Sequence, residues 1–294
     1  MAVYRDYDQS GLDDQYDLRR RVADAAEYVA HREAASARVR GAVVCRTDIA
    51  YGAGAAERLD VFPPSGSAAA RTAALAPAVI YIHGGYWQLS DKSDTSFVAP
   101  AIGAAGIAFV SLNYALAPAV DMDRIVGQIR SAVAFVWRNS ADLGIDRDRM
   151  VVAGHSAGGH LAAMAAAADW PAVAPDLPAD PIKAVCGISG LYDLEPIRLC
   201  YLNDVLGLDA AGAGRNSPIG LAPRIPGPIL LAVGGDETDE YHRQQTALAG
   251  SWRERGADVR EMVVPGAHHY SIIRVLADAN SSLCRAVCEL VTAK

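Results

Sequence analysis

Short apolar runs alternate with longer amphipathic segments along most of this chain. In the first forty residues, Leu18, Val22 and Val29 recur at helical spacing among arginines and acids, which predicts helix. From Thr47 onward, near-continuous apolar runs are bounded by Gly, Pro and Asp, which is typical of strands buried on both faces. The expected strands are residues 59–62, 78–82, 108–112, 150–153, 184–188, 229–233 and 259–264.

Helix-like segments separate these strands, at residues 96–104, 122–139, 157–168, 241–255 and 272–291. This alternation predicts an α/β fold with a mostly parallel central sheet and helices on both faces. Residues 65–76, rich in Ala and Ser, are expected to form an exposed loop, and residues 206–228 an irregular segment. Because no linker or repeat divides the chain, we expect one domain, residues 1–294, with an N-terminal helical extension (1–40) and a core (41–294).

Composition excludes several classes of function. The chain has 294 residues, 51% of them hydrophobic, and a formal net charge of −7, which disfavours disorder and a nucleic-acid partner. No apolar run reaches the ~18 residues that a membrane span needs. The N-terminus has no signal-like apolar run, and the five cysteines form no metal-binding or disulfide pattern. We therefore expect a cytoplasmic protein that acts on a small molecule, with no membrane partner; the sequence leaves a homodimer open.

The motif that indicates chemistry is G-H-S-A-G at residues 154–158, between an expected strand and an apolar helix. It is a G-x-S-x-G pattern in the strand–turn–helix context that gives the pattern its meaning. The glycines leave room for a tight turn, which exposes the Ser156 oxygen above the sheet at the positive end of the helix. Ser156 is therefore the candidate nucleophile. The alternative is a Gly-rich turn in some other α/β fold.

A second turn, His83-Gly84-Gly85, follows the expected strand 78–82. Glycine lets main-chain N–H groups approach a substrate oxygen closely enough to form an oxyanion hole. Gly84 and Gly85 are candidates for that role, together with the N–H of Ala157 directly after the serine. Taken alone, the same turn is equally compatible with an ordinary buried His83.

A serine of this type needs an acid and then a histidine further along the chain. Strand 229–233 is followed by four acids, among them Asp236 and Glu237, although most of these are expected to be solvated or to cap the next helix. Strand 259–264 is followed by His268 and His269, the two histidines that lie in a loop after a late strand. Residue type alone does not choose between these two histidines.

Together these motifs resemble the kynurenine formamidase (arylformamidase) branch of the α/β-hydrolase fold. The resemblance runs through most of the chain, at residues 83–88, 154–164, 189–197, 215–218 and 237–244. The most specific stretch is H-G-G-Y-W at residues 83–87, because many related lipases and esterases have a third glycine or an alanine where Tyr86 stands. The resemblance implies an α/β-hydrolase fold and a substrate of the N-formylkynurenine type.

Position by position, the resemblance implies that Ser156 is the nucleophile and His269 the base, since the family's histidine directly precedes an aromatic residue, here Tyr270. It places the acid at Glu237, where family members from animals have Asp. Glutamate can fill this role with a longer side chain. Asp236 remains the reserve candidate.

These roles predict acyl transfer through an acyl-enzyme, without a metal or organic cofactor. Tyr86 and Trp87 directly follow the oxyanion turn, where we expect them to narrow the acyl side and to contact an aryl group. The expected reaction is removal of a formyl or other very small acyl group from an aryl amide. The alternatives are packing of both rings in the loop, a carboxylesterase or other amide or carbamate hydrolase, and a binding protein that keeps the fold without catalysis.

Overall fold

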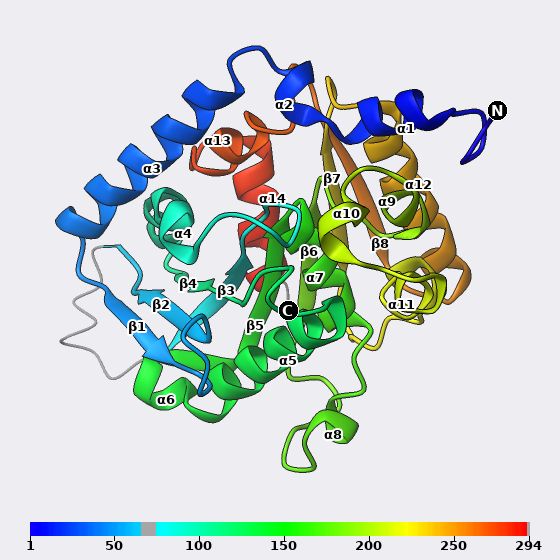
Figure 1. Ribbon diagram of the computed structural model, residues 1–294. Coiled ribbons are helices and arrows are strands. Elements are labelled where there is room, and N and C mark those ends of the chain that lie inside the picture. The colour runs from blue at the N-terminus through cyan, green and yellow to red at the C-terminus, as the bar shows by residue number, and fades with distance from the viewer. Residues whose placement is uncertain (66–74, 293–294) are drawn as a thin grey trace.

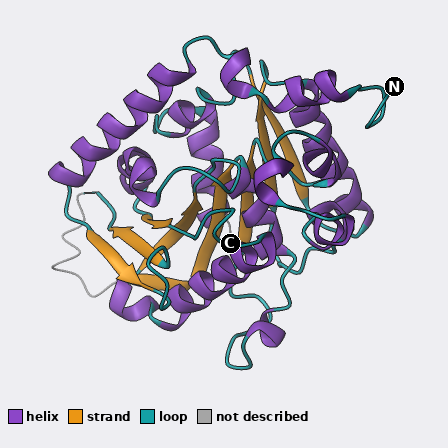
Figure 2. Ribbon diagram, viewed as in Figure 1, coloured by secondary structure: helices purple, strands orange, loops and turns teal. Residues whose placement is uncertain are grey.

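An eight-stranded sheet runs through the centre of the computed structural model, which describes residues 1–65 and 75–292 (Figure 1 and Figure 2). Its strand order is β1-β2-β4-β3-β5-β6-β7-β8. The pairs from β4 to β8 are parallel, and β2 is antiparallel to both β1 and β4, so the predicted mostly parallel α/β sheet is confirmed. The strands are β1 (Arg46–Ala50), β2 (Arg58–Phe62), β3 (Ala76–Ile82), β4 (Ala108–Leu112), β5 (Ile145–His155), β6 (Ala184–Ile188), β7 (Ile229–Gly234) and β8 (Val259–Val264).

Helices cover both faces of the sheet and bury two apolar cores (Figure 1). Alternate side chains of β3 enter different cores, Ile80 and Ile82 on one face and Val79 and Tyr81 on the other, as the two-residue period of a strand requires. Both faces are therefore apolar, which explains the continuous hydrophobic runs in the sequence. The first core is covered by α5 (Met122–Arg138), α7 (Ala157–Ala166) and α12 (Asp239–Glu254), and the second by α4 (Ala99–Ala104), α13 (Ile272–Leu276) and α14 (Ser282–Thr292).

Three local predictions differ from the structure. The strand β1 was not expected, because it lies at the sheet edge and four of its five residues are exposed. The expected helix 272–291 is two helices, α13 and α14, separated by a turn in which the Ser281 hydroxyl accepts from the Cys284 amide. The segment 206–228 contains short helices, and the loop expected at 65–76 falls mostly on residues outside the described ranges. The remaining helices are η1 (Lys92–Val98), α6 (Ser140–Leu143), α8 (Trp170–Val173), α9 (Glu195–Leu199), α10 (Asn203–Leu206), α11 (Ala210–Arg215) and η2 (Pro218–Gly220).

The N-terminal segment forms α1 (Gln9–Tyr16), α2 (Leu18–Arg21) and α3 (Ala25–Ala42), which cross one edge of the molecule (Figure 1). Helix α1 packs against α9 and α12, whereas α3 packs along η1. Leu12 and Tyr16 are fully buried, and the Tyr16 hydroxyl donates to Glu240 on α12 at 2.8 Å. The predicted helical extension is therefore part of the packed structure.

Within residues 1–65 and 75–292, no helix is long and apolar enough to span a membrane.

Candidate active site

Ser156 stands on a sharp turn between β5 and α7, with φ of 58° and ψ of −122°. The neighbouring glycines are needed because other main chain lies against them. A Cβ added to Gly154 would lie 2.1 Å from the Gly158 carbonyl oxygen, and one added to Gly158 would lie 2.0 Å from that of Ile82. A non-glycine residue at positive φ is uncommon and strained, which is typical of a serine held out above a sheet.

The turn after β3 lies directly against this serine. A Cβ on Gly84 would come within 2.9 Å of the Ser156 Cβ, and Gly85 has φ of 110°, a conformation that favours glycine. Ala157 is the first residue of α7, so its amide has no acceptor within the helix. The structure therefore brings together the three residues that the sequence suggested for an oxyanion hole.

His83 supports this turn from below. Its Nδ1 lies 2.8 Å from the Gly84 carbonyl oxygen, and its ring stacks on Tyr114 with centroids 4.3 Å apart. The Tyr114 hydroxyl donates to the His83 carbonyl oxygen at 3.0 Å. Burial lowers the pKa of His83.

Glu237 and His269 form a buried pair. Nδ1 of His269 lies 2.7 Å from Oε2 of Glu237, and the Glu237 side chain is fully buried. The other carboxylate oxygen accepts from the Ser189 hydroxyl and from the Gly234 amide, so both oxygens have donors. Because a carboxylate only accepts, the imidazole carries its proton on Nδ1 and leaves Nε2 for another partner.

The two reserve candidates lie elsewhere. Asp236 is exposed to solvent, whereas the side chain of Glu237 in the same turn is buried. His268 lies in the turn that precedes α13. Its Nδ1 accepts from the amides of Tyr270 and Ser271 at 3.2 and 3.3 Å. Its ring packs edge-on against Tyr28, with centroids 4.8 Å apart. Of the two adjacent acids and the two adjacent histidines, the structure therefore places Glu237 and His269 in contact with each other.

Two further aromatic rings lie against His269. The His155 ring lies 4.5 Å from it and the Tyr241 ring 4.7 Å, measured between centroids. Burial, with the nearby His269 and Arg32, holds the pKa of His155 well below its ordinary value. Burial also raises the pKa of Tyr241 well above its ordinary value, although contacts with the hydroxyls of Tyr86 and Ser156 oppose the rise.

The direction of the hydrogen bonds around Tyr86 can be deduced from its partners. Its hydroxyl lies 2.9 Å from the Tyr16 carbonyl oxygen and 2.7 Å from the Tyr241 hydroxyl. A carbonyl only accepts, so Tyr86 donates to Tyr16 and must accept from Tyr241. The Tyr241 oxygen can then accept a hydrogen bond from the Ser156 hydroxyl.

Trp87 does not lie where the sequence placed it. Its side chain is fully buried, and its indole N–H donates to Nδ1 of His160 on α7 at 3.1 Å. The expectation that Trp87 contacts substrate is therefore wrong. It packs the loop, whereas Tyr86 lines the cavity. Both residues have positive φ, 50° and 59°. The backbone therefore turns sharply here, and the two side chains point in different directions.

Ser156 and His269 open into a cavity of about 490 Å³. Its lining comes from the two glycine turns, the N-terminal segment, the region of η1 and the loop after β8. The lining residues include Tyr16, Asp17, Leu18, Arg19, Val29, Arg32, Glu33, Gly84, Gly85, Tyr86, Asp94, His155, Ser156, Tyr201, His269, Tyr270 and Ile273. The N-terminal segment therefore covers the candidate site, which the sequence left undetermined.

Sequence reasoning missed Ser189, His155 and Tyr241 as members of the site. Ser189 follows β6 as Ser156 follows β5, so both lie at the carboxyl edge of the sheet, where such sites form. Its position directly after the apolar run 184–188 is a signal that sequence reasoning could have used. Tyr241 lies within a helix and has no comparable signal in the sequence.

Comparison with known proteins agrees with this geometry. The BD-FAE family model matches residues 59–204. A candidate thioesterase of known structure from a Silicibacter species is 31% identical, with a TM-score of 0.82 over 96% of this chain and 99% of that one. An esterase from Pyrobaculum calidifontis, at 20% identity, has a TM-score of 0.70 over 94% of this chain and 95% of its own, which supports the fold alone.

Fold, site and neighbours together define a serine hydrolase of the α/β-hydrolase class. Kynurenine formamidase from Danio rerio is 32% identical over 271 residues, which cover 90% of this chain and 88% of that protein. The chain belongs to the kynurenine formamidase family.

Proposed function

We propose that this protein hydrolyses N-formyl aryl amides of the N-formylkynurenine type, releasing formate and the aryl amine. The observation that carries the proposal is the buried pair of His269 and Glu237 in the same cavity as Ser156 and the glycine turn. The relationship to the Danio rerio kynurenine formamidase supports this choice of substrate.

In the proposed mechanism, Nε2 of His269 takes the hydroxyl proton as the Ser156 oxygen attacks the formyl carbon. Glu237 holds the ring through Nδ1 and stabilises its charged form. The oxygen of the tetrahedral intermediate accepts from the amides of Ala157 and Gly85, with Gly84 beside them.

The second half of the reaction uses the same groups in reverse. Protonated His269 gives its proton to the nitrogen of the leaving aryl amine as the C–N bond breaks, which leaves a formyl ester on Ser156. A water molecule then gives a proton to His269 and attacks this ester, and formate leaves as the serine regains its proton. This chemistry is complete with the side chains and amides of the chain.

The preference for a small acyl group is supported by the tyrosines beside the serine. The Tyr86 and Tyr241 hydroxyls, 2.7 Å apart, lie in a partly buried hydrogen-bond chain that ends on the Tyr16 carbonyl oxygen. Moving either ring would break this chain, so the wall is rigid. A formyl hydrogen needs less room against such a wall than an alkyl chain does.

The experiment is a comparison of kcat/KM for N-formylkynurenine, formanilide and butyranilide, on the wild type and on Ser156→Ala. The proposal expects turnover of both formyl compounds, at least about 100-fold weaker turnover of butyranilide, and loss of activity in Ser156→Ala. Equal turnover of the butyryl and formyl anilides would contradict the small-acyl proposal.

A carboxylesterase or thioesterase is the second candidate, because the Silicibacter relative is a candidate thioesterase and the same groups cleave esters. Hydrolysis of p-nitrophenyl acetate without any hydrolysis of N-formylkynurenine would favour it.

For the cell, the proposal is a cytoplasmic enzyme that takes a small-molecule substrate and binds neither nucleic acid nor membrane. Residues 1–294 are proposed to unfold as one domain. Cell fractionation and a single cooperative unfolding transition test these two statements.

A further inference from the structure

The lining of the cavity includes side chains of both charges. Arg19 and Arg32 come from the N-terminal segment, as do Asp17 and Glu33, and Asp94 comes from η1. Charged groups in the lining of a binding cavity commonly orient a polar ligand. Their partners therefore show which of them remain available to a ligand.

Among the described residues, Arg32 forms one ion pair and one side-chain hydrogen bond. One of its terminal nitrogens donates to the Ser90 hydroxyl at 3.2 Å and lies 3.6 Å from Asp94, too long for a direct hydrogen bond. The same Asp94 oxygen already accepts from the Asp91 amide at 3.1 Å, as part of a capping box. The Nε of Arg32 is buried and has no hydrogen-bond partner within the described residues.

A second orphaned nitrogen lines the same cavity. The Nε2 atom of His155 is buried without a partner within residues 1–65 and 75–292, and the residue is only 6% exposed. Leaving a buried donor or acceptor unpaired is unfavourable by about 1–3 kcal/mol, so such atoms are usually satisfied by a ligand or by water. A hydrogen bond to the His269 main chain uses the proton of the neutral His155 ring, so His155 has no proton to donate to an anion.

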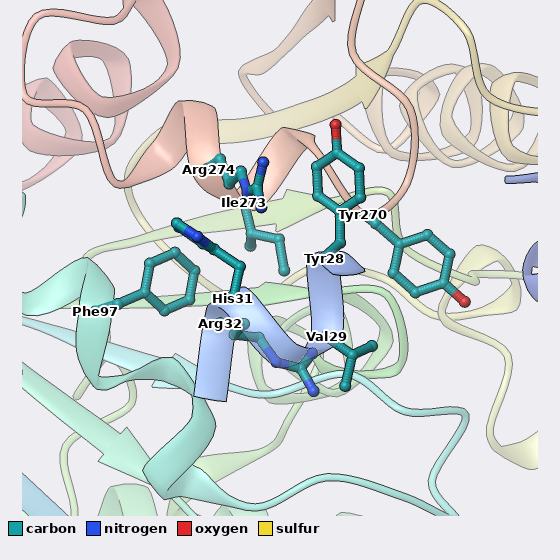
Figure 3. Close-up of a pocket in the computed structure, with 8 residues that line it drawn as sticks. All are labelled: Tyr28, Val29, His31, Arg32, Phe97, Tyr270, Ile273 and Arg274. Carbon is teal, nitrogen blue, oxygen red and sulfur yellow. The ribbon is translucent and has the colours of Figure 1, made fainter. Parts of the chain in front are cut away.

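The other basic side chains of this region have different surroundings. Figure 3 shows that His31 leaves α3 toward Phe97, whereas the Arg32 guanidinium lies beside Val29. Arg274 lies over the Tyr28 ring, 4.1 Å from its centroid, and lines only the small pocket between α3 and α13. Arg19 contacts the Tyr270 hydroxyl. Arg32 and Arg19 both line the Ser156 cavity, and Arg32 is the more buried of the two.

We propose that Arg32 binds a carboxylate on the leaving-amine side of the substrate, which for a kynurenine-type molecule is its amino-acid group. The inference rests on the proposed function for the identity of the substrate. A carboxylate accepts two parallel hydrogen bonds from a guanidinium, and this charge-assisted pair is stronger than a hydrogen bond between neutral groups. Glu33 and Asp17 on the same wall provide negative charge for the ammonium group.

The test compares two formamides that differ in this group, N-formylkynurenine and formanilide, on the wild type and Arg32→Gln. The inference expects kcat/KM for N-formylkynurenine to fall about 10- to 100-fold, mainly through KM, with formanilide within about twofold. Arg38→Gln, on an exposed position of the same helix, is the matched control and changes neither. An equal fall for both substrates, or no fall for either, would overturn the inference.

A binding measurement separates this inference from the proposed function. In titration calorimetry, kynurenine is expected to bind the wild type at least about tenfold more tightly than its carboxamide, and Arg32→Gln is expected to remove the difference. Arg32→Lys, which keeps the charge, restores part of it and shows that the fold is intact. If this preference appears although N-formylkynurenine is not hydrolysed, the proposed function fails and the carboxylate site stands. If kynurenine and its carboxamide bind equally, the carboxylate site is wrong whatever the enzyme hydrolyses.

Discussion

Glu237 and Asp236 are adjacent acids in one turn, and only the three-dimensional path of the chain distinguishes them. The Glu237 amide donates to the Gly234 carbonyl oxygen at 3.2 Å, and the Gly234 amide donates back to the Glu237 carboxylate at 2.8 Å. This reciprocal pair turns the side chain inward toward His269. The charge pattern of the sequence contains no such information, so the choice of Glu237 depended on the family resemblance.

We expect Glu237→Gln to lower kcat on an N-formyl aryl amide by about 10²- to 10⁴-fold, because an amide in place of the carboxylate no longer fixes the His269 tautomer or stabilises its charge. The neighbouring change Asp236→Asn is the control and is expected to stay within about twofold, since Asp236 is exposed. Steady-state kinetics of the two variants decide the assignment. A larger loss in Asp236→Asn than in Glu237→Gln would contradict it.

At the scale of helices and strands, sequence patterns succeed where burial decides the structure. The six strands β2 to β7 are mostly buried because both of their faces are covered, and their apolar runs were predictable. The edge strand β1 is mostly exposed and has no such run. The motifs at Ser156 and Gly84 were predictable for a similar reason, since tight turns restrict residue type. Arg32 and Tyr241 join the site only through tertiary packing, which local patterns do not encode.

Helix α7 illustrates how packing under the site affects stability. His160 on this helix accepts from the Trp87 indole through Nδ1, and its Nε2 donates to the Asn216 carbonyl oxygen at 2.7 Å. Both nitrogens are satisfied only while the ring is neutral, because protonation of Nδ1 would abolish the bond from Trp87. Burial accordingly lowers the pKa of His160 to about 4.

Acid is therefore expected to destabilise the protein through His160. Between about pH 6.5, the ordinary pKa of histidine, and pH 4, the unfolded chain binds this proton and the folded chain does not, so stability falls as pH falls. At pH 5 the expected loss from this residue is about 2 kcal/mol. The variant His160→Gln keeps a donor and an acceptor but cannot titrate. In urea unfolding at pH 8 and pH 5, it should lose about 2 kcal/mol less than the wild type, and an unchanged pH dependence would contradict the assignment.

At the scale of the whole molecule, Tyr16 connects three parts of the chain that are far apart in sequence. Its hydroxyl donates to Glu240 on α12 at 2.8 Å, and the Gln244 side chain donates to it at 3.3 Å. Its carbonyl oxygen accepts from Tyr86, after the oxyanion turn, and from Tyr201 at 3.2 Å. The N-terminal segment is thus attached both to the sheet-covering helices and to the wall of the cavity.

This arrangement predicts that weakening Tyr16 loosens the cover of the site without unfolding the sheet. Tyr16→Phe keeps the ring and the carbonyl bonds but removes the hydrogen bonds of the hydroxyl, one of them to a buried carboxylate, with an expected loss of about 1–2 kcal/mol. Because α1 contacts the rest of the protein mainly through α9 and α12, the loss should appear as local opening, with amide hydrogen exchange in residues 9–21 about tenfold faster and exchange in β5 to β7 unchanged. KM for the formamide substrate should rise, since Tyr16 to Arg19 line the cavity.

Tyr7→Phe is the matched control, because the Tyr7 hydroxyl makes no hydrogen bond within the described residues. Faster exchange throughout the sheet in Tyr16→Phe would instead mean that the N-terminal segment and the core open as one unit.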